Sequence, residues 1–560
     1  GDMIYLYAYK KNEAPDVRKS ILFKGSLQEI HGDRLVVHLN DGQQNPDLIS
    51  GDYFAIGHAG SDIGGTSAIR SLYTFITSNE EHRQLLLGQR VPCVDKSLTL
   101  SRSYHPDYDE IILKAKQAQD YFLLIGPPGT GKTSQALQFL VREQLAEKPK
   151  VQNSKLKVQS SILLLAYTNR AVDEICNMLT ENELDYIRIG NEFSCDPKYS
   201  DHLLKEVLDE NATLNSIKST LADARIVVAT TSTMNSNAAL FNIKYFDLAI
   251  IDEASQILEP NIIGLLTARH TERRAIKRFI LIGDHKQLPA VVQQQDTLEA
   301  EETNNSLKDI HLLSCANSLF ERLILTERAA GRTDFIGTLH KQGRMHPDIA
   351  DFANRKFYAR EQLECVPLAH QLEQTLNYNE TSEDETDDVL KAHRMIFIPS
   401  KPCRQLNISE KVNTEEARII TDLLRRLYRQ LGNNFDPQKS VGVIVPYRNQ
   451  IAMIRKEIEK LGIPELEEIS IDTVERYQGS QRDIILYSFT IQSRYQLDFL
   501  TANTFYEDGK PIDRKLNVAI TRARKQLILT GNEQTLRHNQ LFAELIDYIK
   551  EKGGYYTIER

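Results

Sequence analysis

Short apolar segments alternate with helical patterns along most of this chain, and the alternation restricts the folds open to it. The segments in the first half are 121–125, 161–166, 226–229, 248–251 and 279–282. A second series follows at 395–398, 441–445, 484–489 and 527–530. Between the two, apolar residues recur every three or four positions from 417 to 431 and stop at Gly432. The sequence therefore predicts an α/β chain with two tandem parallel sheets, each covered by helices.

The first hundred residues follow another pattern. Residues 21–30 and 34–39 have strand character and are separated by His31-Gly32-Asp33, and Asp41-Gly42 is a second hairpin signal. Helical spacing begins at Ile69. We therefore expect a small β-barrel at 1–62 and a helical stalk at 63–100. The two α/β domains are expected at 101–345 and 346–560.

The charge balance, taken alone, argues against one class of partner. The chain carries 68 basic and 77 acidic residues, a net charge of −9, whereas a nucleic-acid-binding protein is expected to be basic. Two polar segments, 296–310 with net −4 and 371–390 with net −7, leave +2 on the rest. Both lack apolar periodicity, and we interpret them as exposed loops. The rest of the chain is nearly neutral, which permits binding of nucleic acid and predicts that the binding depends only weakly on salt.

Cysteine spacing and the chain ends favour an intracellular protein, either cytoplasmic or, in a eukaryote, nuclear. The six cysteines are never closer than 19 residues, so no CxxC-type metal motif exists and reduced thiols are expected. No apolar run approaches the ~20 residues of a membrane helix. The first residues show no basic region followed by an apolar core, so no secretory signal is expected. Because the chain begins with Gly1, we interpret it as part of a longer protein.

A glycine-rich loop gives the most specific chemical signal. Residues 126–133 fit G-x-x-x-x-G-K-[ST], after an apolar strand and before a helical stretch. Backbone N–H groups of such a loop surround phosphate oxygens at the positive end of the following helix. Lys132 is expected to neutralise the β- and γ-phosphates, and Thr133 to ligate Mg²⁺. The residues expected to hold the nucleotide are Gly126, Pro127, Pro128, Gly129, Thr130, Gly131, Lys132, Thr133 and Ser134.

Two carboxylates follow the apolar strand at 248–251. We expect Asp252 to hold Mg²⁺ through water and Glu253 to polarise an attacking water. Taken alone, acidic residues after a strand more often begin a helix. Beside a phosphate loop, the pair favours nucleotide hydrolysis over transfer by a kinase.

Further segments recur in a fixed order along the chain. They are AYTNRAVD at 166–173, DEAS at 252–255, GDHKQLP at 283–289, QGRMHP at 342–347, TVERYQG at 473–479 and NVAITRA at 517–523. Their order and spacing resemble superfamily 1 helicases of the 5′-to-3′ class. Within that class, the resemblance is greatest to the helicase half of the flap-processing nuclease-helicases and to the nonsense-mediated-decay helicases. It covers residues 100–535 and implies two tandem RecA-like domains.

The resemblance implies roles at matching positions. Gln287 would sense the γ-phosphate, and Gly479 would lie at the nucleotide. Arg344 and Arg522 would be arginine fingers that reach the nucleotide from the second domain, where a guanidinium suits the charge of phosphoryl transfer. The implied cofactors are ATP, with other nucleoside triphosphates as alternatives, and Mg²⁺.

Three departures from the family pattern concern the nucleotide base. Gly343 stands where relatives carry an aromatic residue, and residues 107–110 hold no obvious adenine-reading glutamine. Gln481 replaces a common glutamate near the ribose. We therefore predict that GTP is hydrolysed within about tenfold of ATP. A strict ATP preference would indicate that Tyr104, Tyr108 or Tyr447 contacts the base.

A single-strand track requires hydroxyls, amides and a few basic residues that follow the strands. By motif match the candidates are Thr168, Asn169, Arg170, Thr230, Thr231, Pro446, Tyr447, Arg448 and Thr473. Helix capping is the alternative role for the threonines. A basic run at 269–278 is interpreted as a solvated helix face.

The leading hypothesis is an ATP-dependent DNA helicase or translocase that moves on single-stranded DNA, 5′ to 3′. An RNA helicase of the nonsense-decay type stays open, because only the 2′-OH separates the two substrates. A nucleotide-gated clamp that does not unwind is the third reading. We expect a monomer, with a nuclease fused to it or partnered with it outside this chain.

Overall fold

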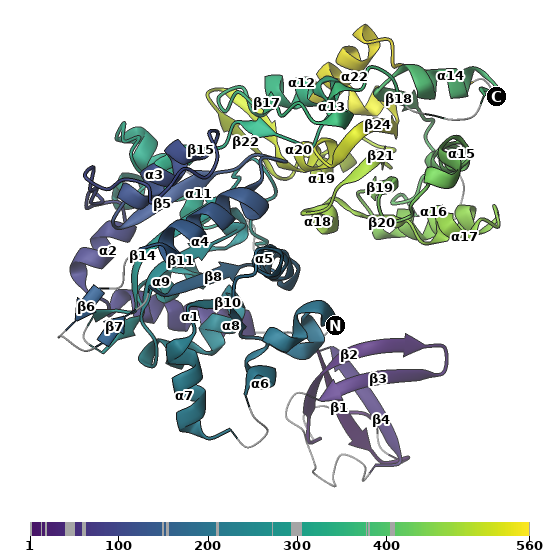
Figure 1. Cartoon of the computed structure of the whole chain (residues 1–560). Helices are drawn as coiled ribbons and strands as arrows, with labels where there is room; N and C mark the ends of the chain where they lie inside the picture. Colours follow the sequence, from purple (N-terminus) through teal and green to yellow (C-terminus); the bar gives the residue numbers. More distant parts are fainter. Residues whose placement is uncertain are drawn as a thin grey trace. The chain divides into compact units, whose positions relative to one another are not determined.

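The computed structural model describes the chain apart from several short segments. These are residues 1–2, 13, 17–19, 40–50, 59–62, 148–149, 153–155, 159, 209–211, 272, 293–304, 377, 379–380, 404–408 and 559–560. The chain divides into two compact units, Gly1–Leu72 and Tyr73–Arg560, and each is described by itself (Figure 1).

The first unit is built on an antiparallel sheet. Its strands β1 (Met3–Tyr9), β2 (Phe23–His31), β3 (Arg34–Leu39) and β4 (Tyr53–His58) lie in the order β3-β2-β1-β4. The hairpin expected around His31-Gly32-Asp33 is therefore present. Among the described strands β3 and β4 form the two edges, and a closed barrel stays a prediction. The turn expected at Asp41-Gly42 lies outside the described residues. Helix α1 (Ile63–Ile76) follows the sheet and crosses into the second unit.

The first parallel sheet of the second unit contains every strand that the sequence predicts there. Seven strands lie in the order β15-β5-β14-β11-β8-β10-β9, and every neighbouring pair is parallel. Their bounds are β5 (Tyr121–Ile125), β8 (Ile162–Ala166), β9 (Ile187–Arg188), β10 (Ile226–Thr230), β11 (Phe246–Ile251), β14 (Ile276–Gly283) and β15 (Ile336–Thr338). β5, β8 and β10 are buried along their whole length, as their apolar sequences require, and β11 and β14 are buried from Leu248 and Phe279 onward.

The second parallel sheet has the order β18-β24-β21-β19-β20. Its strands are β18 (Met395–Pro399), β19 (Val441–Val445), β20 (Ser470–Thr473), β21 (Arg482–Ser488) and β24 (Ala523–Gly531). Alternate residues of each strand enter two separate cores. Met395 and Phe397 pack with α12 (Pro347–Lys356) and α22 (Gln540–Glu551), whereas Ile396 and Ile398 pack with α15 (Thr414–Leu431) and α16 (Arg448–Glu459). Helices therefore cover both faces, and the two tandem RecA-like sheets are confirmed.

Shorter elements complete the second unit. Helices are α2 (Glu80–Leu86), α3 (Asp109–Gln117), α4 (Gln138–Leu145), α5 (Asn169–Glu181), α6 (Leu204–Val207), α7 (Leu214–Asp223), α8 (Thr231–Ser236), α9 (Ile263–Leu266), α10 (Asn305–Asp309), α11 (Leu319–Ala329), α13 (Ala369–Leu372), α14 (Glu385–Ala392), α17 (Pro464–Glu467), α18 (Val474–Tyr477), α19 (Gln496–Leu500), α20 (Arg514–Ile520) and α21 (Glu533–Leu536). Small two-stranded sheets are β6 (Lys150–Gln152) with β7 (Leu156–Val158), β12 (Arg269–His270) with β13 (Arg273–Arg274), β16 (Lys341–Gln342) with β17 (Glu364–Cys365), and β22 (Thr504–Glu507) with β23 (Lys510–Asp513).

Two interpretations of charged segments are wrong. The basic run at 269–278 is not a solvated helix face, because it forms the β12–β13 hairpin and the start of β14. The Arg278 side chain is buried and donates to the Ala115 carbonyl and to Gln144 Oε1.

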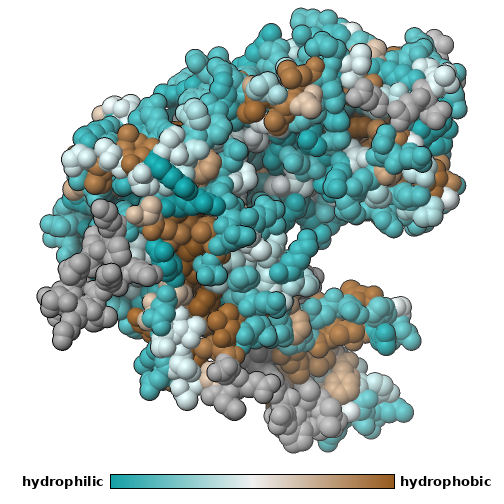
Figure 2. All heavy atoms as spheres, in the orientation of Figure 1, coloured by the Kyte–Doolittle hydropathy of each residue, from teal (hydrophilic) through white to brown (hydrophobic). Residues whose placement is uncertain are grey.

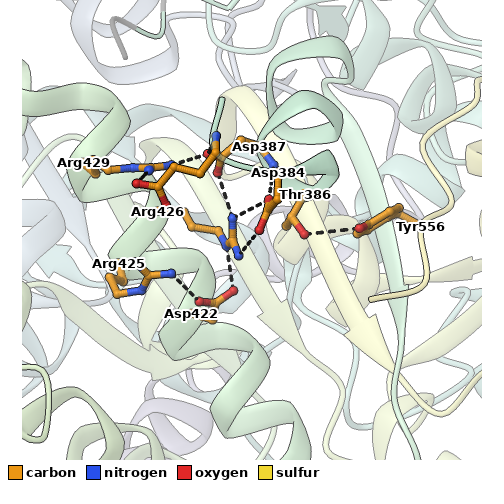
Figure 3. Close-up of polar contacts among 9 residues, drawn as sticks. Asp384, Thr386, Asp387, Asp422, Arg425, Arg426, Arg429 and Tyr556 are labelled. Carbon is orange, nitrogen blue, oxygen red and sulfur yellow. Dashed lines mark hydrogen bonds and ion pairs between the residues drawn. The ribbon is translucent and has the colours of Figure 1, made fainter. Parts of the chain in front are cut away.

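The acidic segment 371–390 is not a loop throughout, because it contains helix α14. Asp387 is fully buried there and faces Arg426 and Arg429 of α15 (Figure 3). Asp384 and Asp422 also accept hydrogen bonds from Arg426, at 2.7 Å each. The ion pairs attach α14 to α15, and the apolar periodicity used to find helices carries no such signal. The other acidic segment, 296–310, lies mostly outside the described residues.

The surface around the second sheet is mainly hydrophilic on the face seen in Figure 2, and apolar residues appear there in small separate groups. This agrees with helices that bury one face against a sheet. Among the residues described, no helix is both long and apolar enough to cross a bilayer.

Candidate nucleotide site and candidate nucleic-acid groove

The phosphate loop connects β5 to a helical turn, Lys132–Leu137, that continues into α4. Gly129 and Gly131 have φ angles of 75° and 72°, which glycine adopts without strain. A Cβ on Gly129 would lie 2.5 Å from the Cβ of Arg344, so this loop and the segment carrying Arg344 approach each other closely. The loop thus leads into a helix N-terminus, the arrangement that binds phosphate.

The two predicted carboxylates lie directly behind the loop. Thr133 Oγ1 donates to Asp252 Oδ2 at 2.6 Å, and Lys132 Nζ lies 3.9 Å from Glu253 Oε1. Burial, and then the negative charge of Glu253, raise the pKa of Asp252 to about 6. Glu253 has a φ of 52°, an uncommon conformation for a residue with a side chain and one that clusters at functional sites.

A divalent cation fits this donor set. Thr133 and Asp252 offer a hydroxyl and a carboxylate oxygen, the hard ligands that Mg²⁺ takes together with phosphate oxygens and water. A cation would also relieve the repulsion between Asp252 and Glu253.

Gln287 connects the two sheets. Its Nε2 donates to Asp284 Oδ2 at 2.9 Å, and its Oε1 accepts from Arg522 Nη2 at 2.9 Å. Asp284 also accepts from the Tyr358 hydroxyl at 2.7 Å. A side chain expected to sense phosphate is therefore bonded directly to one of the expected arginine fingers.

Both arginine fingers are held by neutral oxygens. Arg344 donates through Nε to Gln481 Oε1 at 2.8 Å, and Arg522 donates through Nε to the Val518 carbonyl at 3.0 Å. Among the described residues, neither guanidinium has a carboxylate within ion-pair distance. Burial, and then the charge of Arg522, lower the pKa of Arg344 to about 9, and burial lowers that of Arg522 to about 10. Two guanidinium groups that, in the described part of the chain, have no carboxylate in ion-pair contact make this cleft favourable for phosphate.

These residues line one cavity of about 540 Å³ between the two sheets. The predicted residues on its wall are Pro127, Pro128, Gly129, Thr130, Gly131, Lys132, Thr133, Ser134, Glu253, Gln287, Arg344, Gly479 and Arg522. Gly126 and Asp252 lie behind the wall: a Cβ on Gly126 would meet Lys132 Cγ at 2.1 Å, and Asp252 is buried.

Sequence reasoning missed other residues on this wall. Glu174, one helical turn after Arg170, lines the cavity and pairs with Arg170. Val366 and Leu368 join Gly343 on the wall, and a Cβ on Gly343 would lie 3.0 Å from Leu368 Cδ1. Glu174 follows the AYTNRAVD segment and could have been noticed there, whereas nothing in the sequence marks Leu368.

Of the tyrosines considered for the base, Tyr108 alone lines the cavity. Its hydroxyl donates to the Thr130 carbonyl at 2.9 Å and lies 2.5 Å from Gln135 Oε1. Tyr104 bonds instead to Glu143, and Tyr447 lines a different groove.

The structure brings together the predicted nucleic-acid residues of the second sheet. Pro446, Tyr447 and Arg448 follow β19, and Thr473 ends the parallel neighbour β20, where Val445 pairs with Thr473. All four line a groove of about 860 Å³. Parallel strands that end at the same edge thus place these segments side by side.

The predicted residues of the first sheet have local partners. Thr168 Oγ1 accepts from the Ala171 N–H at the start of α5, and Thr230 Oγ1 accepts from the Thr233 N–H at the start of α8. Thr231 is buried, and Asn169 begins α5 exposed. Arg170 pairs with Glu174 at 3.7 Å and lines a hollow beside Thr133 and Ser134. Thr168 and Thr230 therefore cap α5 and α8, and contact of these residues with nucleic acid stays a prediction.

Comparison with known proteins agrees with this geometry. Residues 105–219 and 209–295 match one AAA domain family, and residues 315–534 match a second. The "DNA replication ATP-dependent helicase/nuclease" JHS1 of Arabidopsis thaliana is 29% identical over 501 residues, 86% of this chain and 33% of that protein. DNA2 of Xenopus laevis, with the same description, is 30% identical over 464 residues, 79% of this chain and 38% of that protein.

The chain therefore spans little more than a third of these relatives. Among solved structures, the arterivirus nonstructural protein 10 helicase matches with a TM-score of 0.33 and 15% identity, covering 77% of this chain and 62% of that chain. With its ordered motifs, its two sheets around one cavity and these sequence matches, the chain belongs to the superfamily 1 helicases and is related to the DNA2 helicase/nucleases.

Proposed function

We propose that this chain is an ATP-dependent DNA helicase or translocase that moves 5′ to 3′ on single-stranded DNA. The observation that carries the proposal is the composite cavity: the phosphate loop and carboxylates come from the first sheet, and Arg344 and Arg522 come from the segments around the second. Hydrolysis in such a cavity is sensitive to the separation of the two sheets. The names of the relatives, which describe ATP-dependent DNA replication helicase/nucleases, support the same proposal.

In this mechanism the phosphate loop and Lys132 hold the β- and γ-phosphates. Thr133 and Asp252 would hold Mg²⁺, which would supply positive charge to the phosphates when bound. Glu253 orients and polarises the attacking water, and Arg344 and Arg522 stabilise the charge that develops on the transferred phosphoryl group.

Coupling to movement would pass through the contacts between the sheets. The Arg522–Gln287 hydrogen bond already joins a first-sheet sensor to a second-sheet finger. Nucleotide binding would draw both fingers onto the phosphate and close the cleft, and hydrolysis would release them. The groove lined by Pro446, Tyr447, Arg448 and Thr473 would then shift along the strand relative to the first sheet.

We further propose that the α/β domains divide between 339 and 345, a few residues before the predicted boundary at 345 and 346. Leu339 packs in the core of the first sheet, whereas Met345 already packs in a core of the second. A nuclease outside this chain, a monomeric state and an intracellular location, nuclear in a eukaryote, are proposals of the same kind.

Steady-state hydrolysis tests the function. ATP turnover is measured with single-stranded DNA, with single-stranded RNA and with neither, beside Lys132→Ala as the inactive control. We expect DNA to stimulate the wild type and Lys132→Ala to be inactive throughout. Stimulation by RNA alone would indicate the RNA helicase, and stimulation without displacement of a tailed duplex would indicate the clamp. If neither polymer stimulates hydrolysis, the translocase proposal fails.

Duplexes with a single-stranded tail at one end test the direction. A 5′-to-3′ motor displaces the strand of a 5′-tailed duplex and leaves the 3′-tailed one intact. Displacement from the 3′ tail alone would reverse the proposed polarity.

A further inference from the structure

The groove on the second sheet contains aromatic side chains that none of the family segments includes. Tyr495 and Phe499 line it together with Tyr447, and they lie four residues apart at α19. Residues with this spacing project from the same side of a helix. Both rings are well exposed, with 60% of Tyr495 and 43% of Phe499 accessible to solvent.

The Phe499 ring is held in place. It stacks on Tyr447 with ring centroids 4.9 Å apart and an angle of 22° between the planes. Lys515 Nζ lies 4.0 Å from the Phe499 centroid and donates to the Phe499 carbonyl at 3.1 Å. Tyr447 is buried, so the stack is anchored at the end of β19. Tyr495 is the freer ring, without an aromatic partner among the described residues.

Charge around these rings suits a polyanion. Lys411, Arg448 and Arg476 line the groove against two acidic residues, Glu410 and Glu475. Lys515 lies 3.4 Å from Glu475 and offsets its charge. Within the part of the chain that the structure describes, no carboxylate lies within ion-pair distance of Lys411 or Arg448. Exposed rings beside cations are the combination that single-stranded nucleic acid requires, stacking for bases and charge for phosphates.

We infer that Tyr495 and Phe499 form a base-stacking platform for single-stranded nucleic acid, with Lys411 and Arg448 placed for its phosphates. The inference rests on the proposed function and deepens it, because the groove of the second sheet would contact the bases of the strand as well as its backbone. Tyr495 offers the open ring, while Phe499 is supported from behind by Tyr447. Stacking tolerates every base, so the platform would hold the strand without reading its sequence.

The platform is tested by measuring binding of two labelled oligomers. One is an oligothymidylate, and the other is a matched oligomer with abasic sugars. We expect Tyr495→Ala to weaken binding of the oligothymidylate by about 5- to 100-fold, the range for loss of one aromatic–base stack, and to leave binding of the abasic oligomer unchanged. Because Tyr495 is 60% exposed, its truncation removes little packing. Tyr506→Ala, which removes a 73% exposed ring on β22 outside the groove, is the matched control and should bind both oligomers as the wild type does.

Tyr495→Trp gives a second, independent readout. The chain contains no tryptophan, so this variant carries a single indole in the groove. We expect its fluorescence to be quenched by oligothymidylate and not by the abasic oligomer, with affinity restored to about that of the wild type.

The outcomes separate this inference from the proposed function. If the wild type binds oligothymidylate and Tyr495→Ala binds it equally well, the platform is wrong while the translocase proposal stands. Equal weakening on both oligomers would also overturn the platform. If the wild type binds neither oligomer, both the platform and the translocase proposal are contradicted. The groove would then be a binding surface for a protein partner.

Discussion

Around Gly343, where the nucleotide base is expected, single side chains of the cavity wall decide how strongly the protein discriminates between bases. Gly343, Val366 and Leu368 offer no side-chain hydrogen bond there, and the Tyr108 hydroxyl is already bonded to the Thr130 carbonyl. Strong discrimination requires polar groups that a wrong base leaves unpaired, whereas apolar contact discriminates weakly.

We therefore expect kcat/KM for GTP to lie within about tenfold of that for ATP. Initial rates with both nucleotides and saturating single-stranded DNA provide the comparison. A preference for ATP far beyond tenfold would contradict this account and point to a base contact from Tyr108.

Glu416 gives a pH-dependent contribution to stability. Its buried carboxylate accepts from Ser488 Oγ at 2.6 Å and from the Thr490 N–H at 2.7 Å, yet burial raises its pKa from 4.5 to about 7. The unfolded chain therefore releases this proton at a lower pH than the folded chain. The stability that Glu416 contributes is fully present below about pH 4.5 and is lost as the pH rises through about 7.

Glu416→Gln removes this titration. Relative to the wild type, the variant should gain about 2 kcal/mol of unfolding free energy between about pH 5 and about pH 8. Urea unfolding at both pH values measures the difference, and Glu415→Gln, a partly buried neighbour on the same helix, serves as the control. A difference that stays constant with pH would show that Glu416 is ionised throughout.

Among the elements, α14 shows where sequence patterns stop being informative. Strands such as β5 and β19 were predicted at their observed bounds, because unbroken apolar runs between loops leave few alternatives. Helix α14 was missed because polar contacts hold it. Its Asp387 binds Arg426 and Arg429 of α15, and no local sequence rule links partners so far apart in the chain (Figure 3).

Some residues of the candidate sites could likewise be predicted from the sequence, and others could not. Motif segments predicted most of the nucleotide wall. The phosphate loop and Glu253 follow the ends of β5 and β11, and Arg522 lies between α20 and β24. Leu368 and the Tyr495–Phe499 pair could not be predicted, because each gains its position from the tertiary packing around α13 or α19.

Asp387→Ala tests how α14 is attached. Removing one partner of a buried ion pair leaves Arg429 without its buried carboxylate and should lower the unfolding free energy by about 3 kcal/mol. Asp388→Ala, an exposed neighbour on the same helix, should change it by less than about 0.5 kcal/mol. Thermal unfolding of both variants checks this, and equal effects would mean that the ion pairs contribute little.

At the scale of the whole molecule, the net charge of −9 and a few groove cations set the electrostatics of binding. Among the described residues, the cations that line the groove are Lys411, Arg448 and Arg476, so few counterions are released when a strand binds. We expect a shallow slope of log affinity against log salt, measured by fluorescence anisotropy. A slope typical of about eight or more phosphate contacts would reveal a larger basic track than these residues provide.

The central claim is that hydrolysis needs residues from both sheets at once. The most direct test is DNA-stimulated ATP hydrolysis by Arg522→Ala, with ATP binding measured in parallel. Arg522 completes the cavity from the second sheet and bonds Gln287 of the first, so the account predicts that kcat falls by about 1000-fold while ATP still binds. Hydrolysis by Arg522→Ala at the wild-type rate would contradict it.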